Sequence, residues 1–246
     1  MNPKPTHQFL CRLAAGVGLA MLAGCATTNE SATPATAAGP GPGGALPAKY
    51  RAADGRPIEI GRNSVSGDGI AFKEPHMDKC WIANGFKFTG YDVLYIAPTI
   101  STLKVHDDEQ MPFGLAKSKL PQEIARFVQM TGVFPAVVLN ESEIKPGAKA
   151  LKLENTIIEY SKGGGGARYF AGIYGAGQPT LKVQGNMTDG GKPVFTFEAR
   201  RSGVSAGARM TGAFMKDEDI QVEDIRSMAL DLSDFVAAIA GKYQPR

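Results

Sequence analysis

A serine in the pattern Gly-x-Ser-x-Gly stands at Ser205, between Gly203 and Gly207. In hydrolases this pattern holds a nucleophilic serine on a sharp turn between a strand and a helix, and a histidine later in the chain takes the serine proton. The residues from 208 to 212 contain a glycine and no apolar stripe, so a helix is not predicted there, and no histidine follows Ser205. We therefore expect a glycine loop. A Ser205-dependent hydrolase is kept only as the last of three hypotheses.

Two sets of side chains have the chemistry of metal ligands. His76 and Cys80 stand four residues apart, which on a helix would place both on one face. Pro75 and the strand-like Trp81 argue against a helix, and two ligands do not complete a zinc site. His106 precedes three acidic residues and is typical of a solvated turn. We expect no metal site and no cofactor apart from a covalent lipid.

Four arginines could form a basic interaction surface that contacts lipid phosphates or glycan carboxylates: Arg168, Arg200, Arg201 and Arg209. The competing interpretation, which we favour, is a solvated hairpin end. The glycine-rich run from 163 to 177 lacks the Gly-Lys-Ser/Thr and the helix start of a phosphate-binding loop, so we expect a connection between strands.

A cysteine with different chemistry lies near the start of the chain. A basic amino-terminal segment is followed by eleven apolar or glycine residues, Leu13 to Ala23, and then by Gly24 and Cys25. Such a run matches a secretory signal and is too short to cross a bilayer as a helix. The sequence Leu-Ala-Gly-Cys resembles the lipobox of bacterial lipoproteins. This resemblance implies cleavage between Gly24 and Cys25 and acylation of Cys25. The competing interpretation is a buried amino-terminal helix.

The same resemblance predicts where the protein is held. Two or three acyl chains on Cys25 would anchor it stably. Ala26, in place of an aspartate, resembles the outer-membrane sorting pattern, so we expect the periplasmic side of the outer membrane. Residues 26–50 are rich in Ala, Pro, Gly and Thr and predict a disordered tether with a span of roughly 25–30 Å. The expected parts are a signal peptide (1–24), the lipidated cysteine and tether (25–50), strands or an arm (51–90) and a domain (91–246).

Composition excludes some functions. Without the signal peptide, 25 Lys and Arg stand against 24 Asp and Glu, which gives a formal charge of +1. A nearly neutral domain has no general attraction for nucleic acid. Cys80 is the one cysteine left after the signal and Cys25, so an intramolecular disulfide is not expected. Stability must come from a hydrophobic core, for which the chain after residue 50 is long enough.

The periodicity of apolar residues predicts an α+β fold. Residues 51–90 show only short alternations and predict one or two short strands, or an extended arm that packs on the domain. The later elements are expected as strand 92–97, helix 120–131 closed by Gly132, strand 134–139, strand 150–160, hairpin 181–199 and helix 219–243. Pro121 is expected in the first turn of the first helix, and a bulge near Asn155 or Thr156.

This order, strand-helix-strand-strand-hairpin-helix, predicts a single mostly antiparallel sheet with both helices on one face. Residues 91–243 also resemble DUF4410, a family of bacterial lipoprotein domains of unknown function. The resemblance rests on 91–98 (YDVLYIAP), 131–134 (TGVF), 151–160 (LKLENTIIEY), 168–177 (RYFAGIYGAG) and the Asp-Gly-Gly-Lys turn. It implies no catalytic residue.

Three functions are compatible with these features. The first is a non-enzymatic, lipid-anchored adaptor that binds an envelope protein, for example by adding a partner strand at the edge strand that Pro135 begins. The second is a binding module for a small or lipidic ligand in a groove between the helices and the sheet. The hydrolase is third. We expect no enzymatic activity and no nucleic-acid partner.

Overall fold

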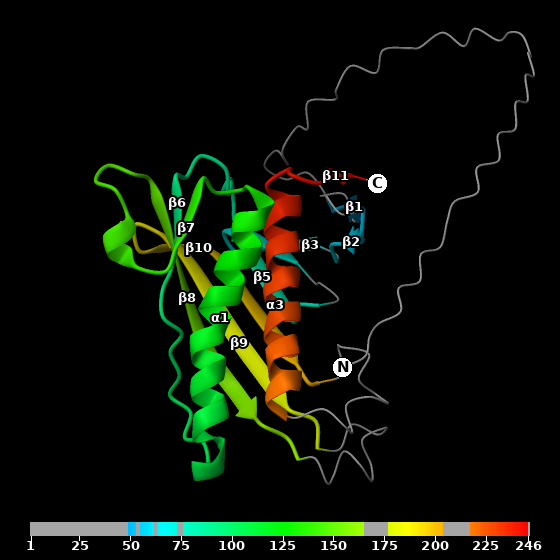
Figure 1. Cartoon of the computed structure of the whole chain (residues 1–246). Helices are drawn as coiled ribbons and strands as arrows, with labels where there is room; N and C mark the ends of the chain where they lie inside the picture. The colour runs from blue at the N-terminus through cyan, green and yellow to red at the C-terminus, as the bar shows by residue number, and fades with distance from the viewer. Residues whose placement is uncertain are drawn as a thin grey trace, which may run out of the picture. The chain divides into compact units, whose positions relative to one another are not determined.

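Eight strands form one sheet at the centre of the described chain, which in this computed structural model comprises residues 49–52, 55–61, 63–72, 76–164, 177–203 and 217–245. The strands are β3 (Asn63–Ser66), β4 (Gly69–Phe72), β5 (Lys79–Ala83), β6 (Val93–Ile96), β7 (Ala136–Val138), β8 (Ala150–Ser161), β9 (Thr180–Asp189) and β10 (Lys192–Arg201). Their order across the sheet is β3-β4-β5-β10-β9-β8-β6-β7 (Figure 1). Neighbouring strands are antiparallel, except that β6 is parallel to both β7 and β8.

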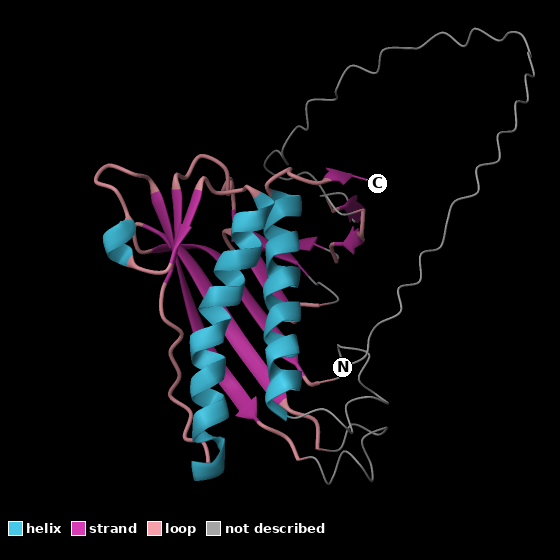
Figure 2. Ribbon diagram, viewed as in Figure 1, coloured by secondary structure: helices cyan, strands magenta, loops and turns pink. Residues whose placement is uncertain are grey.

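Two long helices, α1 (Gln110–Thr131) and α3 (Asp217–Ile239), pack against each other on one face of this sheet (Figure 2). Two short 3-10 helices, η1 (Asp107–Glu109) and η2 (Glu141–Glu143), lie in loops. A second sheet of three strands has the order β11-β1-β2, from β1 (Lys49–Arg51), β2 (Pro57–Glu59) and β11 (Gln244–Pro245). Within the described ranges, no helix has the length and apolar character needed to span a membrane.

The predicted α+β class is confirmed, and the predicted order of elements is present from β6 to α3. The expectation of a single mostly antiparallel sheet is met only in part, because β6 makes the large sheet mixed and a separate small sheet is present. Residues 51–90 supply one strand to the small sheet and three to the large one. Strands of three to five residues contain too few alternations to give a clear periodic signal.

The first helix differs from its prediction at one end. It closes at Gly132, whose φ of 63° is left-handed, as expected for a helix C-cap. It begins ten residues earlier than expected, at Gln110, so Pro121 lies inside the helix rather than in its first turn. Gly114 and Pro121 both lower helix propensity, which weakens the signal of the first half.

The core between the helices and the large sheet is centred on Phe195 of β10, which is fully buried. Its ring centroid lies 5.4 Å from that of Phe88, 5.8 Å from that of Phe197 and 5.8 Å from that of Phe235 on α3. Every residue of β6 is buried, which confirms the prediction of a strand covered on both faces. The aromatic cluster therefore joins α3 to the middle of the sheet.

Gly185 on β9 is required by this packing. A Cβ atom added there would lie 1.9 Å from Cε1 of Phe197. We expect Gly185→Ala to lower the free energy of unfolding by about 2 kcal/mol or more, because a buried ring would have to move. Urea unfolding of the full chain measures this. Gly164→Ala is the matched control, because its Cβ would have no neighbour within 4 Å. Equal stability of the two variants would contradict the packing argument.

Candidate functional site

A hollow of about 400 Å³ lies where the C-terminal ends of α1 and α3 meet the small sheet. We call it the helix-end groove. It is lined by Ala52, Arg56, Phe127, Met130, Thr131, Leu230, Ser233, Asp234, Lys242 and Tyr243. Its walls are mainly apolar, and Met130 on α1 is 74% exposed. The groove therefore presents apolar side chains that the core does not cover.

The lining of the helix-end groove also contains polar and charged side chains. Asp234 of α3 accepts a hydrogen bond from Arg56 at 3.1 Å and another from the Tyr243 hydroxyl at 2.8 Å. Burial raises the pKa of the Asp234 carboxyl, while the Tyr243 hydrogen bond and the Arg56 charge oppose the increase. Arg56 and Lys242 are the cations of the lining and Asp234 is its one carboxylate, so the ionised lining has a net charge of +1.

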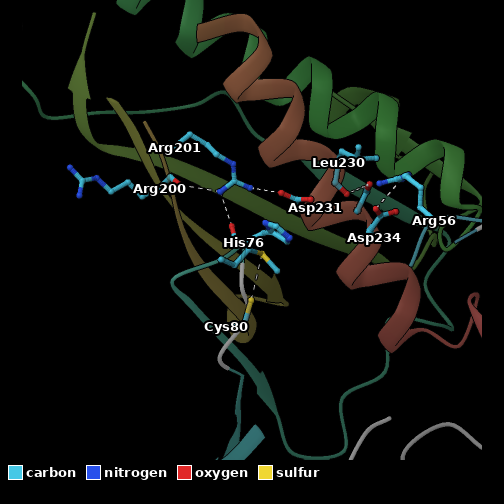
Figure 3. A network of polar contacts seen from close by, with 10 residues as sticks. Arg56, His76, Cys80, Arg200, Arg201, Leu230, Asp231 and Asp234 are labelled. Carbon is cyan, nitrogen blue, oxygen red and sulfur yellow. Dashed lines mark hydrogen bonds and ion pairs between the residues drawn. The ribbon is translucent and has the colours of Figure 1, made fainter. Parts of the chain in front are cut away.

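A second polar contact lies one helical turn away (Figure 3). Arg201 of β10 donates to Asp231 at 2.6 Å and to the backbone carbonyl of His76 at 2.7 Å. Burial raises the pKa of the Asp231 carboxyl against the opposing charge of Arg201. These contacts fasten α3 to the last residue of β10 and to the segment that leads into β5.

A smaller cavity of about 100 Å³ adjoins these carboxylates and is lined by Arg56, Pro57, Ile58, Glu59, His76, Asp231 and Asp234. The Arg56–Asp234 pair therefore borders both hollows. Asp231 and Asp234 each have an arginine partner. Lys242 is therefore the one cation in the lining of the helix-end groove that has no ion pair among the described residues. This arrangement is suited to an apolar ligand with one anionic group.

The arginines predicted as a basic patch do not lie together where the structure describes them. Arg200 is exposed and pairs with Glu159 at 2.8 Å. Arg201 is 5% exposed and points to the opposite face of β10 (Figure 3). Side chains alternate between the faces of a strand, so neighbouring residues cannot share one surface. Arg168 and Arg209 lie outside the described residues.

The other residues considered as sites are a serine, the two residues at the expected cleavage point and a cysteine. Ser205, Gly24 and Cys25 lie outside the described residues. Cys80 is buried in the core, with its Sγ 3.7 Å from Sδ of Met77.

His76 and His106 have the chemistry of metal ligands. His76 is exposed, and its backbone carbonyl contacts Arg201. His106 precedes η1 and accepts a backbone hydrogen bond from Glu109 at 2.9 Å. In the part of the chain that the structure describes, no cluster of three or more His, Cys, Asp or Glu side chains could hold a metal ion.

Sequence reasoning missed Arg56, Asp231 and Asp234, which no motif marks. Arg56 and Asp234 are 178 residues apart in the chain. One signal was present: Asp224, Asp231 and Asp234 recur at intervals of seven and three along the apolar side of a helix. Buried carboxylates need partners, so this spacing indicates a paired polar site.

Two comparisons with known proteins found no match, and a third found solved structures of low sequence identity. No family model matches the chain, and no curated protein matches it. Two structures of PelC dodecamers from Paraburkholderia phytofirmans align at 13% and 14% identity, with TM-scores of 0.40 and 0.41. They cover 63% and 62% of this chain and 95% and 96% of theirs. Protein XCC0632 from Xanthomonas campestris, of family DUF330, aligns at 14% identity with a TM-score of 0.40 over 64% of this chain and 89% of its own.

Proposed function

We propose that this protein is an outer-membrane lipoprotein, anchored through acylated Cys25, whose periplasmic domain binds an apolar ligand with one anionic group. A fatty acid and a lysophospholipid have this chemistry. The observation that supports the proposal is the helix-end groove, which combines mainly apolar walls with a lining of net charge +1. The proposed role is binding without catalysis, and membership of DUF4410 stays a prediction.

Size and polarity support this choice of ligand. Small-molecule sites have volumes of about 300–1,000 Å³ and combine apolar walls with a few polar groups. The helix-end groove, at about 400 Å³, falls in this range. A carboxylate or phosphate head would lie near Lys242 and Arg56, while the chain would pack on Phe127, Met130 and Leu230.

Two exposed methionines on the same helix provide a matched test. Met130 lines the helix-end groove and is 74% exposed, whereas Met111 is 81% exposed at the other end of α1. We expect Met130→Glu to weaken binding of dodecanoate by about 10-fold, because a charged group would replace the apolar side chain on which the hydrocarbon chain packs. Met111→Glu should have no effect. Titration calorimetry of the full chain measures both.

Two further comparisons separate the effect of charge from that of shape. Lys242→Gln should weaken dodecanoate binding by about 3–10-fold and leave dodecanol binding unchanged, because only dodecanoate has a negative charge with which Lys242 can pair. Saturable dodecanoate binding that is equal in wild type, Met130→Glu and Lys242→Gln would reject the groove as the site. No saturable binding of either amphiphile would reject the ligand class.

A second proposal, an adaptor that binds an envelope protein by strand addition, is supported by one edge of the large sheet. At the β7 edge, which Pro135 precedes as expected, the N–H of Val137 donates to the Gln129 side chain at 2.9 Å, so one backbone donor of this edge is already occupied. At the other edge, β3 pairs with β4 and with no further strand among the described residues, and Val65 is 80% exposed. A partner strand would therefore add at β3.

In-cell photocross-linking distinguishes the two edges. A photoreactive residue at Val65 should capture one reproducible envelope protein, and the same residue at Leu139, just after β7, should not. Capture of the same proteins from both positions, or from neither, would contradict strand addition at β3.

Anchoring is tested separately. We expect Cys25→Ala to abolish labelling by radioactive palmitate and to move the protein out of the outer-membrane fraction, because stable anchoring needs at least two acyl chains. Fractionation and metabolic labelling measure this. Cys80→Ala is the control, since Cys80 is buried in the core. Unchanged labelling of the Cys25→Ala variant would contradict the lipoprotein proposal.

A further inference from the structure

A second hollow lies on the other side of α1 and shares no residue with the helix-end groove. It has a volume of about 360 Å³ and separates α1 from the segment that follows β6. We call it the proline groove. It is lined by Ile96, Pro98, Thr99, Gly114, Lys117, Ser118, Pro121, Gln122 and Leu139.

The proline groove contains a buried hydroxyl with no partner. Thr99 is 6% exposed, and its Oγ1 has no hydrogen-bond partner among the described residues. Asn155, fully buried on β8, lies behind the same segment and accepts a backbone hydrogen bond from Ile100 at 3.0 Å. Both polar atoms of the Asn155 side chain are also unpaired within the described chain. Leaving such groups unsatisfied destabilises a fold, so a native protein normally supplies a partner.

The helix lacks one backbone donor beside the proline groove. Pro121 lies inside α1 and has no backbone N–H, so the carbonyl of Lys117, four residues earlier, loses its usual helical donor. Both residues line the groove. Proline inside a helix destabilises it by about 3 kcal/mol, so its presence at this position indicates a local role.

Two other features define the space beside these acceptors. A Cβ atom added to Gly114 would have no neighbour within 4 Å, so the groove is open over this turn of α1. Lys117 is the one charged residue of the lining, but its Nζ lies 5.9 Å above the ring of Phe113, which does not line the groove. The ammonium thus lies near an aromatic ring outside the lining, and the remaining lining is neutral.

We propose that the proline groove binds a small neutral molecule with a branched apolar body and a primary amide group. The two N–H donors of the amide match Thr99 Oγ1 and the Lys117 carbonyl. The amide oxygen accepts from the Gln122 side chain at the rim, and the apolar body lies against Ile96, Pro98 and Leu139. The Thr99 hydroxyl could donate to a carboxylate, but the Lys117 carbonyl can only accept, so a carboxylate would leave that carbonyl without a donor.

Three probes with the same apolar body test the chemistry: isobutyramide, isobutyrate and isobutylamine. In NMR titrations of the full chain, isobutyramide should bind saturably and perturb the amide signals of Thr99 and Gly114. Isobutyrate and isobutylamine should bind at least about 10-fold more weakly. Equal binding of all three probes, or no saturable shift with isobutyramide, would overturn the proposal.

Three substitutions and one control variant locate the site. Thr99→Val removes the hydroxyl and Pro121→Ala supplies a donor to the Lys117 carbonyl, so each should weaken isobutyramide binding about 5-fold without reducing stability. Gly114→Leu should abolish binding by filling the space, whereas Gly114→Ala, which also removes a helical glycine, should keep it. Isobutyramide binding that survives Gly114→Leu would place the probe elsewhere. Dodecanoate binding in the helix-end groove should be unaffected by all of these variants.

Discussion

Arg201→Met is expected to lower the free energy of unfolding by about 3 kcal/mol at neutral pH. Methionine keeps most of the packing of the long side chain, so the loss reports the charge. The arginine side chain is 4% exposed, and that of its partner Asp231 is 22% exposed. Without Arg201, the carboxylate stays in the interface between α3 and β10 and loses the cation to which it is hydrogen-bonded. Urea unfolding of the full chain measures the change.

Two controls make this expectation specific. Arg200→Met alters the neighbouring residue, whose exposed pair with Glu159 lies on the other face of β10, and should cost less than about 1 kcal/mol. The double variant Arg201→Met with Asp231→Leu should regain most of the stability, since removing both members of a buried pair is often neutral. If Arg201→Met and Arg200→Met destabilise equally, the buried pair does not fasten α3 to the sheet.

Asp224→Asn is expected to change how stability depends on pH. Asp224 is 1% exposed, and its Oδ2 accepts a hydrogen bond from the Gly203 N–H at 2.8 Å. Burial raises its pKa from 3.8 to about 6, against the opposing effects of the Gly203 hydrogen bond and the Arg201 charge. The folded state therefore binds the proton more tightly than the unfolded state.

The raised pKa of Asp224 determines whether stability increases or decreases with pH. As the pH rises from about 4 to above 6, the folded wild type must give up a proton that it binds more tightly, so Asp224 makes it progressively less stable. Asparagine keeps an acceptor for Gly203 and does not titrate. The stability of Asp224→Asn relative to wild type should thus increase by about 2–3 kcal/mol between about pH 4 and pH 7.

Urea unfolding of wild type and Asp224→Asn across this pH range tests the expectation. The informative quantity is how the difference between their free energies of unfolding changes with pH. Any constant cost of the substitution, such as an unpaired amide group, cancels in that comparison. A difference between the two proteins that is independent of pH would show that Asp224 titrates normally in the folded state.

Elements with a strong local pattern were predictable from the sequence. The β9–β10 hairpin turns at the Asp-Gly-Gly-Lys sequence, and helix α3 follows its apolar stripe to within a few residues of the expected ends. A bulge was expected on β8 and is present, but the register shifts between Ile157 and Glu159, two to three residues after the predicted position. Alternation shows that two halves differ in phase and does not fix where the extra residue lies.

The rest depends on contacts between distant segments. The start of α1 was obscured by Gly114 and Pro121, two residues that also line the proline groove. Local rules fail most readily where a site requires an unfavourable residue. Arg56 directly precedes the short strand β2, in a stretch with no periodic signal, and its partner Asp234 is distant in the chain. Only the fold brings the two together, so a sequence motif could not indicate the helix-end groove.

The most direct test of the proposed binding function is to identify the molecule that co-purifies with the full chain from the cells that produce it naturally. Wild type and Met130→Glu would be purified side by side under native conditions and analysed by native mass spectrometry, with solvent extraction of any bound molecule. We expect a single-chain anionic amphiphile bound to wild type and strongly reduced in Met130→Glu, with Met111→Glu equal to wild type. An empty wild-type protein, or the same amphiphile at the same occupancy in all three, would contradict it.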